Sequence, residues 1–183
     1  MPPMSLRRQI VLAAERAFDR EGFAATGMDR LVREAGVSSR TLYKHVGSKD
    51  ALALAVLEGR GERFFAGLPG DRVAGLFDGL GRWIEAEGAR GCLFLRAHGE
   101  YAARDAAIVA LVRRHKARLA DEVARRVAGD LGRSDADLAR QILILFEGAT
   151  AAAVHLGPGA ATAAGAAADA LVALARGKAP WAP

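Results

Sequence analysis

The amino-acid sequence predicts an all-α protein of about nine helices, with an N-terminal three-helix domain followed by a larger helical bundle. Three observations support this prediction. Apolar residues recur at helical spacing along nearly the whole chain, no segment shows the alternation typical of a strand, and alanine-rich segments favour helix. With 183 residues, of which 51% are hydrophobic, the chain is long enough to bury a core.

The first helix is expected to run from Ser5 to about Glu21. Ser5 is a suitable N-cap, because its hydroxyl can accept a bond from an unsatisfied backbone N–H. Ile10 and Phe18 belong to the apolar face of this helix, and Gly22 ends it. Residues 1–4, which include two prolines, are expected to be disordered.

Residues 28–49 predict two short helices joined by a tight turn. Leu31 lies on the apolar face of the first, and Gly36 can take the left-handed conformation that ends a helix. Ser38 is a suitable N-cap for the second helix, whose Leu42 faces inward. From Ser38 to residue 49 the side chains include bases and hydroxyls but no acid. The pattern indicates a helix-turn-helix that contacts DNA, although helix–glycine–helix corners with solvated basic faces also occur in other helical proteins.

The remaining helical patterns form the larger part of the chain. They lie at about 48–66, 71–86, 92–103, 106–128, 135–155 and 161–176, and residues 177–183 are expected to form coil. We therefore expect a DNA-binding domain at residues 1–48 and a second domain at residues 49–183.

Composition limits the class of protein further. The formal net charge of +5 is mildly positive, which is compatible with nucleic-acid binding without requiring it. Cys92 is the only cysteine, no signal peptide is visible, and no apolar run is long enough to span a bilayer. These features predict a cytoplasmic protein without a disulfide, metal or cofactor.

The segment from Ile10 to Leu57 resembles the TetR family of bacterial repressors. The matching positions are Ala17-Phe18, Gly22-Phe23, Thr26, Ala35-Gly36-Val37-Ser38, Thr41-Leu42-Tyr43 and Ser48-Lys49-Asp50-Ala51-Leu52. The resemblance implies a ligand-sensing and dimerisation domain at 49–183, and repression relieved by a small molecule. Two positions depart from the family pattern: Val46 replaces a usual Phe, and Gly27 replaces a frequent Ser or Thr cap.

The resemblance also implies which residues contact the DNA operator. Arg40 and Thr41 are expected at base edges, and phosphate contacts are expected from Tyr43, Lys44, His45 and Lys49. The full predicted set is Thr26, Ser38, Ser39, Arg40, Thr41, Tyr43, Lys44, His45 and Lys49.

Two further surfaces are predicted in the second domain. The helix at 141–146 is apolar almost all round, and the last helix carries a seam of small residues, so both are expected to form a homodimer interface. Its predicted residues are Ile142, Leu145, Ala164, Ala168, Leu171 and Val172. A pocket for a mostly apolar effector is expected among Phe64, Trp83, Phe94, His98, Tyr101, Phe146 and Glu147. The same apolar residues are also consistent with a monomeric core.

Enzyme motifs are missing from the sequence. It contains no nucleophile elbow, phosphate-binding glycine loop or zinc-protease motif. Cys92 paired with His98 or His115 is the one nucleophile arrangement that the composition offers. We therefore predict a regulator without catalytic residues. A helical small-molecule-binding protein that does not bind DNA is the alternative, and a helical enzyme is the third candidate.

Overall fold

The computed structural model describes residues 4–177, and the described chain consists of nine α-helices without a strand. The helices are α1 (Leu6–Glu21), α2 (Met28–Ala35), α3 (Ser39–Val46), α4 (Lys49–Ala66), α5 (Val73–Glu87), α6 (Leu93–Tyr101), α7 (Ala106–Leu131), α8 (Ala136–Leu156) and α9 (Gly159–Arg176). The all-α prediction is confirmed. The disorder expected at residues 1–3 and the coil expected at residues 178–183 concern positions outside the described residues.

The chain forms two compact units. Unit 1 comprises the residues up to 63 together with 93–114, and unit 2 comprises residues 64–92 and those from 115 onward. The expected functional boundary at residue 48 does not coincide with this grouping, because unit 1 also contains α6 and most of α4. The assignment of DNA binding and sensing to particular segments remains a prediction.

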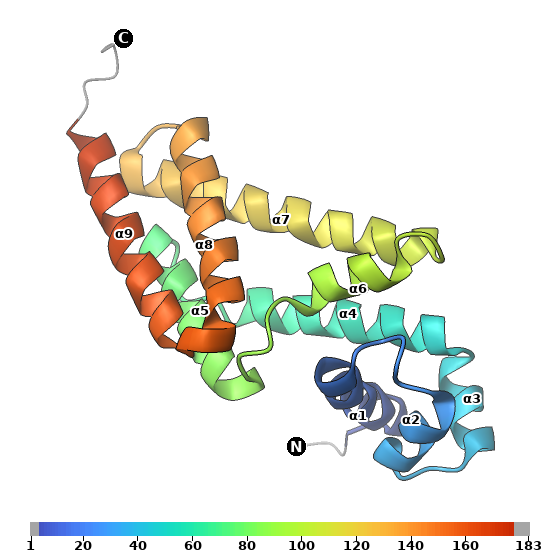
Figure 1. Cartoon of the computed structure of the whole chain (residues 1–183). Helices are drawn as coiled ribbons and strands as arrows, with labels where there is room; N and C mark the ends of the chain where they lie inside the picture. The colour runs from blue at the N-terminus through green and yellow to red at the C-terminus, as the bar shows by residue number, and fades with distance from the viewer. Residues whose placement is uncertain (1–3, 178–183) are drawn as a thin grey trace. The chain divides into compact units, whose positions relative to one another are not determined.

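Unit 1 is organised around the helices α1, α2 and α3 (Figure 1). Ile10 and Phe18 of α1, Leu31 of α2 and Leu42 of α3 are at most 1% exposed. The side chain of Val46 is also buried. These residues form the small core that holds the three helices together.

A buried ion cluster joins α1 to α4 inside unit 1. The Glu15 carboxylate accepts hydrogen bonds from Arg60 Nη1 at 2.8 Å and from Arg63 Nη2 at 2.6 Å. The side chains of Glu15 and Arg60 are only 4% and 7% exposed. Burial of these charges is tolerated because each of them is paired.

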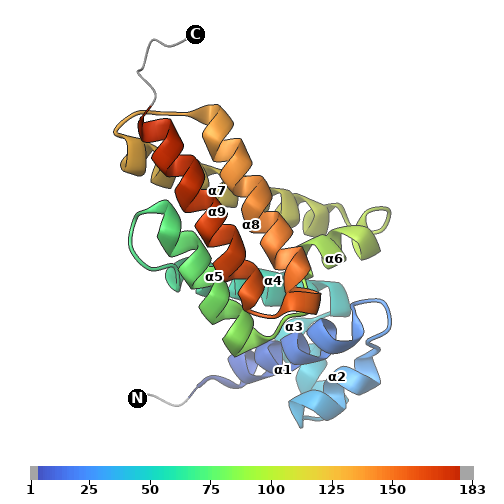
Figure 2. The ribbon, with the colours of Figure 1, turned by 60° about the vertical axis from the view of Figure 1, so that its left-hand side comes forward.

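In unit 2, α8 and α9 lie side by side, with α5 packed against both (Figure 2). The core of unit 2 includes Leu76 of α5, Val123 of α7, Phe146 of α8 and Val172 of α9. Among residues 4–177, no helix combines the length and apolar character that a membrane span requires.

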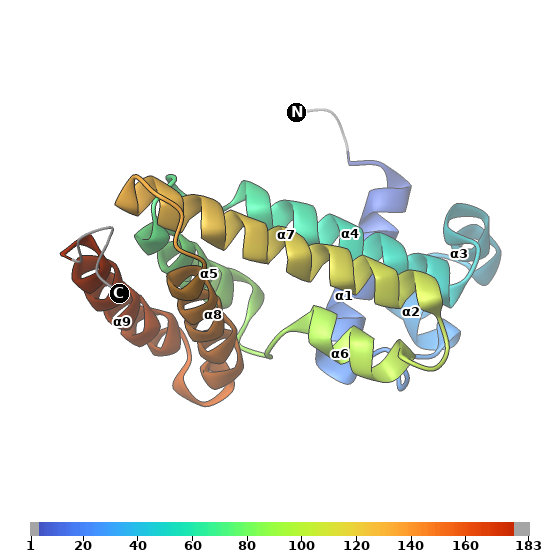
Figure 3. The same cartoon turned by 90° about the horizontal axis from the view of Figure 1, so that it is seen from above.

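Helix α7 is continuous over 26 residues and can be followed along its length in Figure 3. It ends at Leu131, three residues after the predicted end. Val127 is fully buried, and the Asp130 carboxylate accepts a hydrogen bond from the backbone N–H of Val73 at 2.8 Å. The spacing of apolar residues cannot reveal a hydrogen-bond partner so distant in the sequence.

The turn between α4 and α5 is held by a buried arginine. Arg126, only 1% exposed, donates to the carbonyl oxygens of Pro69 at 3.0 Å and Arg72 at 2.9 Å. Its Nε donates to Glu122 at 2.7 Å. Gly75 lies directly against this group, and a Cβ there would approach the Pro69 carbonyl oxygen to 2.1 Å.

Candidate nucleic-acid interface

Helices α2 and α3 meet at the turn that the sequence predicts. Gly36 has φ +64°, the left-handed conformation that favours glycine. Ser38 then caps α3, because its hydroxyl accepts from the backbone N–H of Thr41 at 3.2 Å and contacts the Thr41 hydroxyl at 2.9 Å. The hydroxyls of Ser38 and Thr41 thus contact each other near the surface of the protein.

The outward side of α3 is polar and basic. Ser39, Arg40 and Lys44 are exposed, and the Tyr43 side chain is 49% exposed. His45 is half-buried on the same short helix. Because α3 contains no acid, these groups form a surface with hydrogen-bond donors and positive charge but no competing carboxylate of their own helix.

Thr26 requires a correction. Its side chain is 0% exposed, and its hydroxyl donates to the carbonyl oxygen of Gly22 at 2.6 Å. The predicted contact between the Thr26 side chain and DNA is therefore wrong, because this side chain is buried and stabilises the turn between α1 and α2 instead. Lys49 is half-buried, and its Nζ donates to the Ala24 carbonyl oxygen at 3.4 Å. Burial and the nearby Arg104 guanidinium lower the pKa of Lys49.

Two residues of α6 contact the same turn and were missed by sequence reasoning. Glu100 accepts from the backbone N–H groups of Phe23 and Ala24, and Arg96 donates to the carbonyl oxygen of Asp19 at 2.8 Å. The sequence carries no signal for this contact, because Phe23 and Glu100 are separated by 77 positions.

The seven predicted effector-binding residues fall into two groups. Phe64, Trp83 and Phe146 cluster in unit 2, with ring centroids 5.5 Å apart for Phe64 and Trp83 and 6.0 Å apart for Phe64 and Phe146. Phe94, His98 and Tyr101 belong to unit 1, where Phe94 and Tyr101 are buried. Their assembly into one pocket remains a prediction.

Glu147, the seventh predicted residue, has a partner within the chain. Its carboxylate accepts from Lys116 Nζ at 2.7 Å, and the same Nζ lies 3.3 Å from Cys92 Sγ. Lys116 therefore balances the charge of Glu147 within the chain, and the place of Glu147 in an effector pocket remains a prediction.

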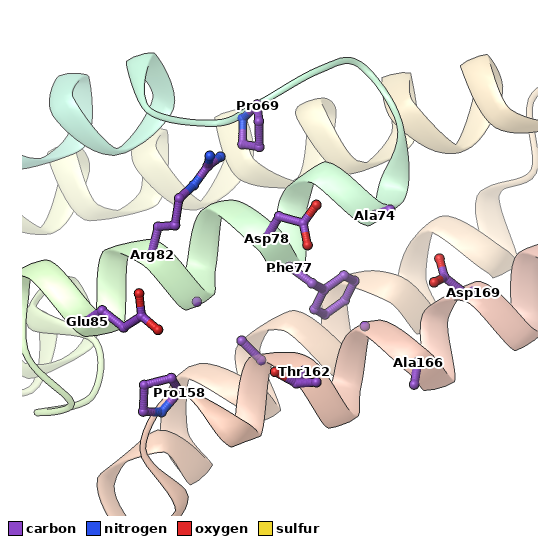
Figure 4. A pocket seen from close by; sticks show the side chains of 13 residues that line it. Pro69, Ala74, Phe77, Asp78, Arg82, Glu85, Pro158, Thr162, Ala166 and Asp169 are labelled. Atoms are coloured by element: carbon purple, nitrogen blue, oxygen red, sulfur yellow. The ribbon is translucent and has the colours of Figure 1, made fainter.

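A separate groove of about 640 Å³ lies between α5 and α9 (Figure 4). Phe77 and small residues line it together with the charged side chains Asp78, Arg82, Glu85 and Asp169. None of the seven predicted residues lines this groove, and its charged rim differs from the mostly apolar pocket that the sequence suggests.

Three of the six predicted dimer residues are buried within the chain, and the role of the other three remains a prediction. Ile142, Ala168 and Val172 are at most 5% exposed, because α5, α8 and α9 pack against one another and enclose them. Leu145, Ala164 and Leu171 are half-buried. Other apolar side chains of α8 and α9 are exposed instead: Ile144 by 65%, Val154 by 54%, Leu156 by 63% and Leu174 by 62%.

A short, acid-free helix set on a preceding helix by a tight turn defines a helix-turn-helix protein of the DNA-binding class. Comparison with known proteins agrees. Residues 10–56 match the family described as bacterial regulatory proteins, tetR family. The transcriptional activator FasR of Mycolicibacterium smegmatis is 38% identical over 68 residues, which are 37% of this chain and 31% of FasR. The match thus spans about a third of the length of FasR.

The likeness to solved structures extends over nearly the whole chain. A TetR-family transcriptional regulator from Streptomyces coelicolor superposes with a TM-score of 0.80 at 26% identity, covering 93% of this chain and 96% of the other. A tetR-type regulator from Streptomyces avermitilis gives 0.68 at 29% identity, covering 91% and 99%. The segment at residues 10–56 therefore matches the TetR family of DNA-binding transcriptional regulators, and nearly the whole chain is similar in structure to TetR-family regulators.

Proposed function

We propose that this protein is a cytoplasmic, homodimeric repressor that binds a palindromic operator and is released by a small, mostly apolar molecule. The observation that carries the proposal is the outward face of α3, where Arg40, Tyr43 and Lys44 are exposed beside a capped N-terminus. A helix presented in this way can enter the major groove with its first residues at base edges.

The DNA contacts are tested with a duplex selected by the wild-type protein from a random-sequence pool. Arg40→Ala should weaken binding by about 1–3 kcal/mol and relax specificity at one base pair. Lys44→Ala should weaken binding to all sequences alike and reduce the salt slope by about one, because it removes a phosphate contact. Arg82→Ala in α5, also an exposed arginine, is the matched control. Unchanged affinity and salt slope in both α3 variants contradict the docking.

The dimer is proposed through the exposed apolar side chains of α8 and α9. Ile144 and Leu174 are large, apolar and more than 60% exposed. A partner subunit would remove these side chains from water, and a second copy offers the same surface through a two-fold axis. Two recognition helices then read half-sites roughly 34–36 Å apart.

Sedimentation at micromolar concentration tests this surface. Ile144→Glu and Leu174→Glu should give folded monomers that bind the selected duplex weakly. Leu95→Glu, at a leucine of α6 that is 53% exposed, is the control and should leave the dimer intact. A wild-type protein that sediments as a monomer removes this part of the proposal.

Effector binding is proposed near the aromatic cluster of Phe64, Trp83 and Phe146. Helix α4 supports a link to DNA, because it begins at Lys49, directly after α3, and reaches Phe64 and Phe65. A ligand releases DNA only if it binds the DNA-incompetent state more tightly. By linkage, operator DNA must then weaken ligand binding by the same factor. Titration of an apolar ligand, identified by thermal-shift screening, with and without the duplex measures this factor. Equal affinities refute control by that site.

Activation is the second candidate, because the relative FasR is named as an activator. A reporter gene placed behind the selected duplex distinguishes the two functions. Deletion of the regulator should raise expression if it represses and lower it if it activates. Failure of the wild-type protein to select any duplex instead favours a helical ligand-binding protein without DNA binding.

A further inference from the structure

The groove between α5 and α9 follows both helices along their length. Its lining residues recur at spacings of three or four, from Ala74 to Glu85 on α5 and from Pro158, the N-cap of α9, to Asp169. Residues spaced in this way lie on one face of a helix, so the two faces that form the groove extend over about three helical turns. A site of this shape fits an elongated ligand better than a compact one.

The floor of the groove is apolar. Phe77 is 4% exposed and Ala161 is 1% exposed, so both line the groove from its buried side. Gly165 lets α9 approach α5 at this place, since a Cβ at position 165 would lie only 3.1 Å from the Cβ atom of Phe77. The floor can therefore remove methylene groups of a ligand from water, but it offers them no charge.

The rim of the groove carries four exposed charged side chains. Three are the carboxylates of Asp78, Glu85 and Asp169, and the fourth is the guanidinium of Arg82. In the described part of the chain, no hydrogen bond or ion pair occupies any of these four side chains. Figure 4 shows Arg82 directed toward Pro69 and away from α9, so carboxylates dominate the space between the two helices. Although the whole chain has a formal net charge of +5, the groove therefore attracts cations.

The three carboxylates are spread along the groove and do not meet at one point. In Figure 4, Glu85 lies at the end of the groove where Pro158 lies. Asp169 lies toward the opposite end, and Asp78 lies between the two. Asp78 and Glu85 are separated on α5 by about 10 Å along the helix axis. Because a divalent metal ion requires several oxygen ligands within about 2.6 Å, carboxylates at this spacing cannot share one ion. They can each meet a different positive group of an extended ligand.

We propose that the groove between α5 and α9 binds an unbranched aliphatic polyamine. The ammonium groups of this ligand pair with Glu85, Asp78 and Asp169, and its methylene groups cover the floor at Phe77. The groove is distinct from the effector site proposed at the aromatic cluster, because the residues of that cluster do not line it. The proposal goes beyond regulation by DNA binding, and none of its tests uses DNA, so either proposal can fail without the other.

Isothermal titration calorimetry of the full chain with spermidine, a linear triamine, tests the proposal at physiological ionic strength. We expect saturable binding at a single site. Glu85→Gln and Asp169→Asn should each weaken this binding about fivefold, the upper range for a solvent-exposed ion pair. Asp137→Asn is the matched control, because it changes the net charge equally by removing an exposed carboxylate of α8 outside the groove, and it should bind spermidine like the wild type. Equal weakening in all three variants, or no saturable binding to the wild type, overturns the proposal.

A compact cation separates the length of the ligand from its charge. Hexaamminecobalt(III) carries the same positive charge as spermidine but cannot reach both ends of the groove. It should bind at least about fivefold more weakly than spermidine, because at least one ion pair is lost. The short diamine 1,3-diaminopropane should also bind more weakly, for the same reason. Binding of the compact cation as tight as that of spermidine contradicts an extended ligand and overturns the proposal.

A substitution that changes no charge tests whether the ligand lies in the groove. Ala166 is an exposed lining residue of α9, and Ala166→Trp should fill the groove and abolish spermidine binding. Spermidine should shift the amide NMR signals of α5 and α9 in the wild type but not in this variant. If Ala166→Trp does not fold, Thr162→Arg replaces it, because it places a cation at an exposed position of the same groove. Wild-type affinity for spermidine in the folded variant overturns the proposal.

Discussion

Replacement of Gly75 by alanine should destabilise unit 2 severely, although alanine is the better helix former. The added Cβ would lie 2.1 Å from the Pro69 carbonyl oxygen and 2.8 Å from Nη1 of Arg126. Neither the carbonyl oxygen nor the guanidinium nitrogen can move away easily. The carbonyl belongs to the backbone, and Arg126 is buried and held by the carbonyl oxygens of Pro69 and Arg72.

The magnitude follows from three contributions. Overpacking typically destabilises by about 1–3 kcal/mol. Each displaced hydrogen bond from the charged guanidinium adds about 1.5–3 kcal/mol, while the helix propensity of alanine returns at most about 1 kcal/mol. With one bond displaced, we expect the free energy of unfolding to fall by about 4 kcal/mol. The thermal midpoint should then fall by roughly 10 °C in a chain of this length.

Urea denaturation of the variant, at the protein concentration used for the wild type, measures this change. Gly129→Ala is the matched control, because Gly129 is an exposed glycine of α7 whose Cβ would meet its nearest neighbour at an ordinary 3.7 Å. The control should be stabilised by about 0.5–1 kcal/mol. A Gly75→Ala protein within 1 kcal/mol of the wild type would show that the turn before α5 accommodates the methyl group and would refute the reasoning.

Three other perturbations should be informative. Glu15→Met should destabilise by about 3–5 kcal/mol in urea denaturation, because it removes the buried carboxylate that pairs with Arg60 at 2.8 Å and with Arg63 at 2.6 Å; a loss below 1 kcal/mol would contradict this role. Burial, and to a smaller extent the positive charges of Lys116 and Arg118, lower the pKa of His115 to about 4. Between pH 6.5 and 4 the unfolded chain therefore binds more protons, so stability should fall as the pH falls through this window, and His115→Gln should flatten that part of the profile. Hydrogen bonds from Arg125 and Arg126 lower the pKa of Glu122 to about 2, although its partial burial acts in the opposite direction. The ionised Glu122 therefore stabilises the folded chain above pH 4.5, and this stabilisation should be lost as the pH falls toward 2. Glu122→Gln should abolish this part of the pH dependence.

Local signals predicted much of the fold. Ser5, Ser38 and Asp135 cap α1, α3 and α8 where the sequence places helix starts, because a capping hydroxyl or carboxylate acts on a backbone N–H only three residues away. Gly36 ends α2 for an equally local reason. Interactions that close within one helical turn can be read from sequence alone.

Partners distant in sequence could not be predicted in this way. The apolar character of Ile142 and Ile144 is the same, yet the first is buried and the second is 65% exposed. Periodicity identifies apolar faces but not which neighbour covers them. For the same reason the pairing of Glu147 with Lys116 and the burial of Thr26 appear only when the helices are assembled.

The contact between Glu100 and Phe23 also has a consequence for biosynthesis. The two residues are 77 positions apart, whereas α1, α2 and α3 are complete by Val46. At a translation rate of about 5–20 residues per second, roughly 4–15 s pass between synthesis of the turn and synthesis of the carboxylate that holds it. A nascent chain therefore contains the complete helix-turn-helix before the Glu100 carboxylate has been synthesised. Until α6 has been synthesised, the backbone N–H groups of Phe23 and Ala24 lack the carboxylate that accepts their hydrogen bonds.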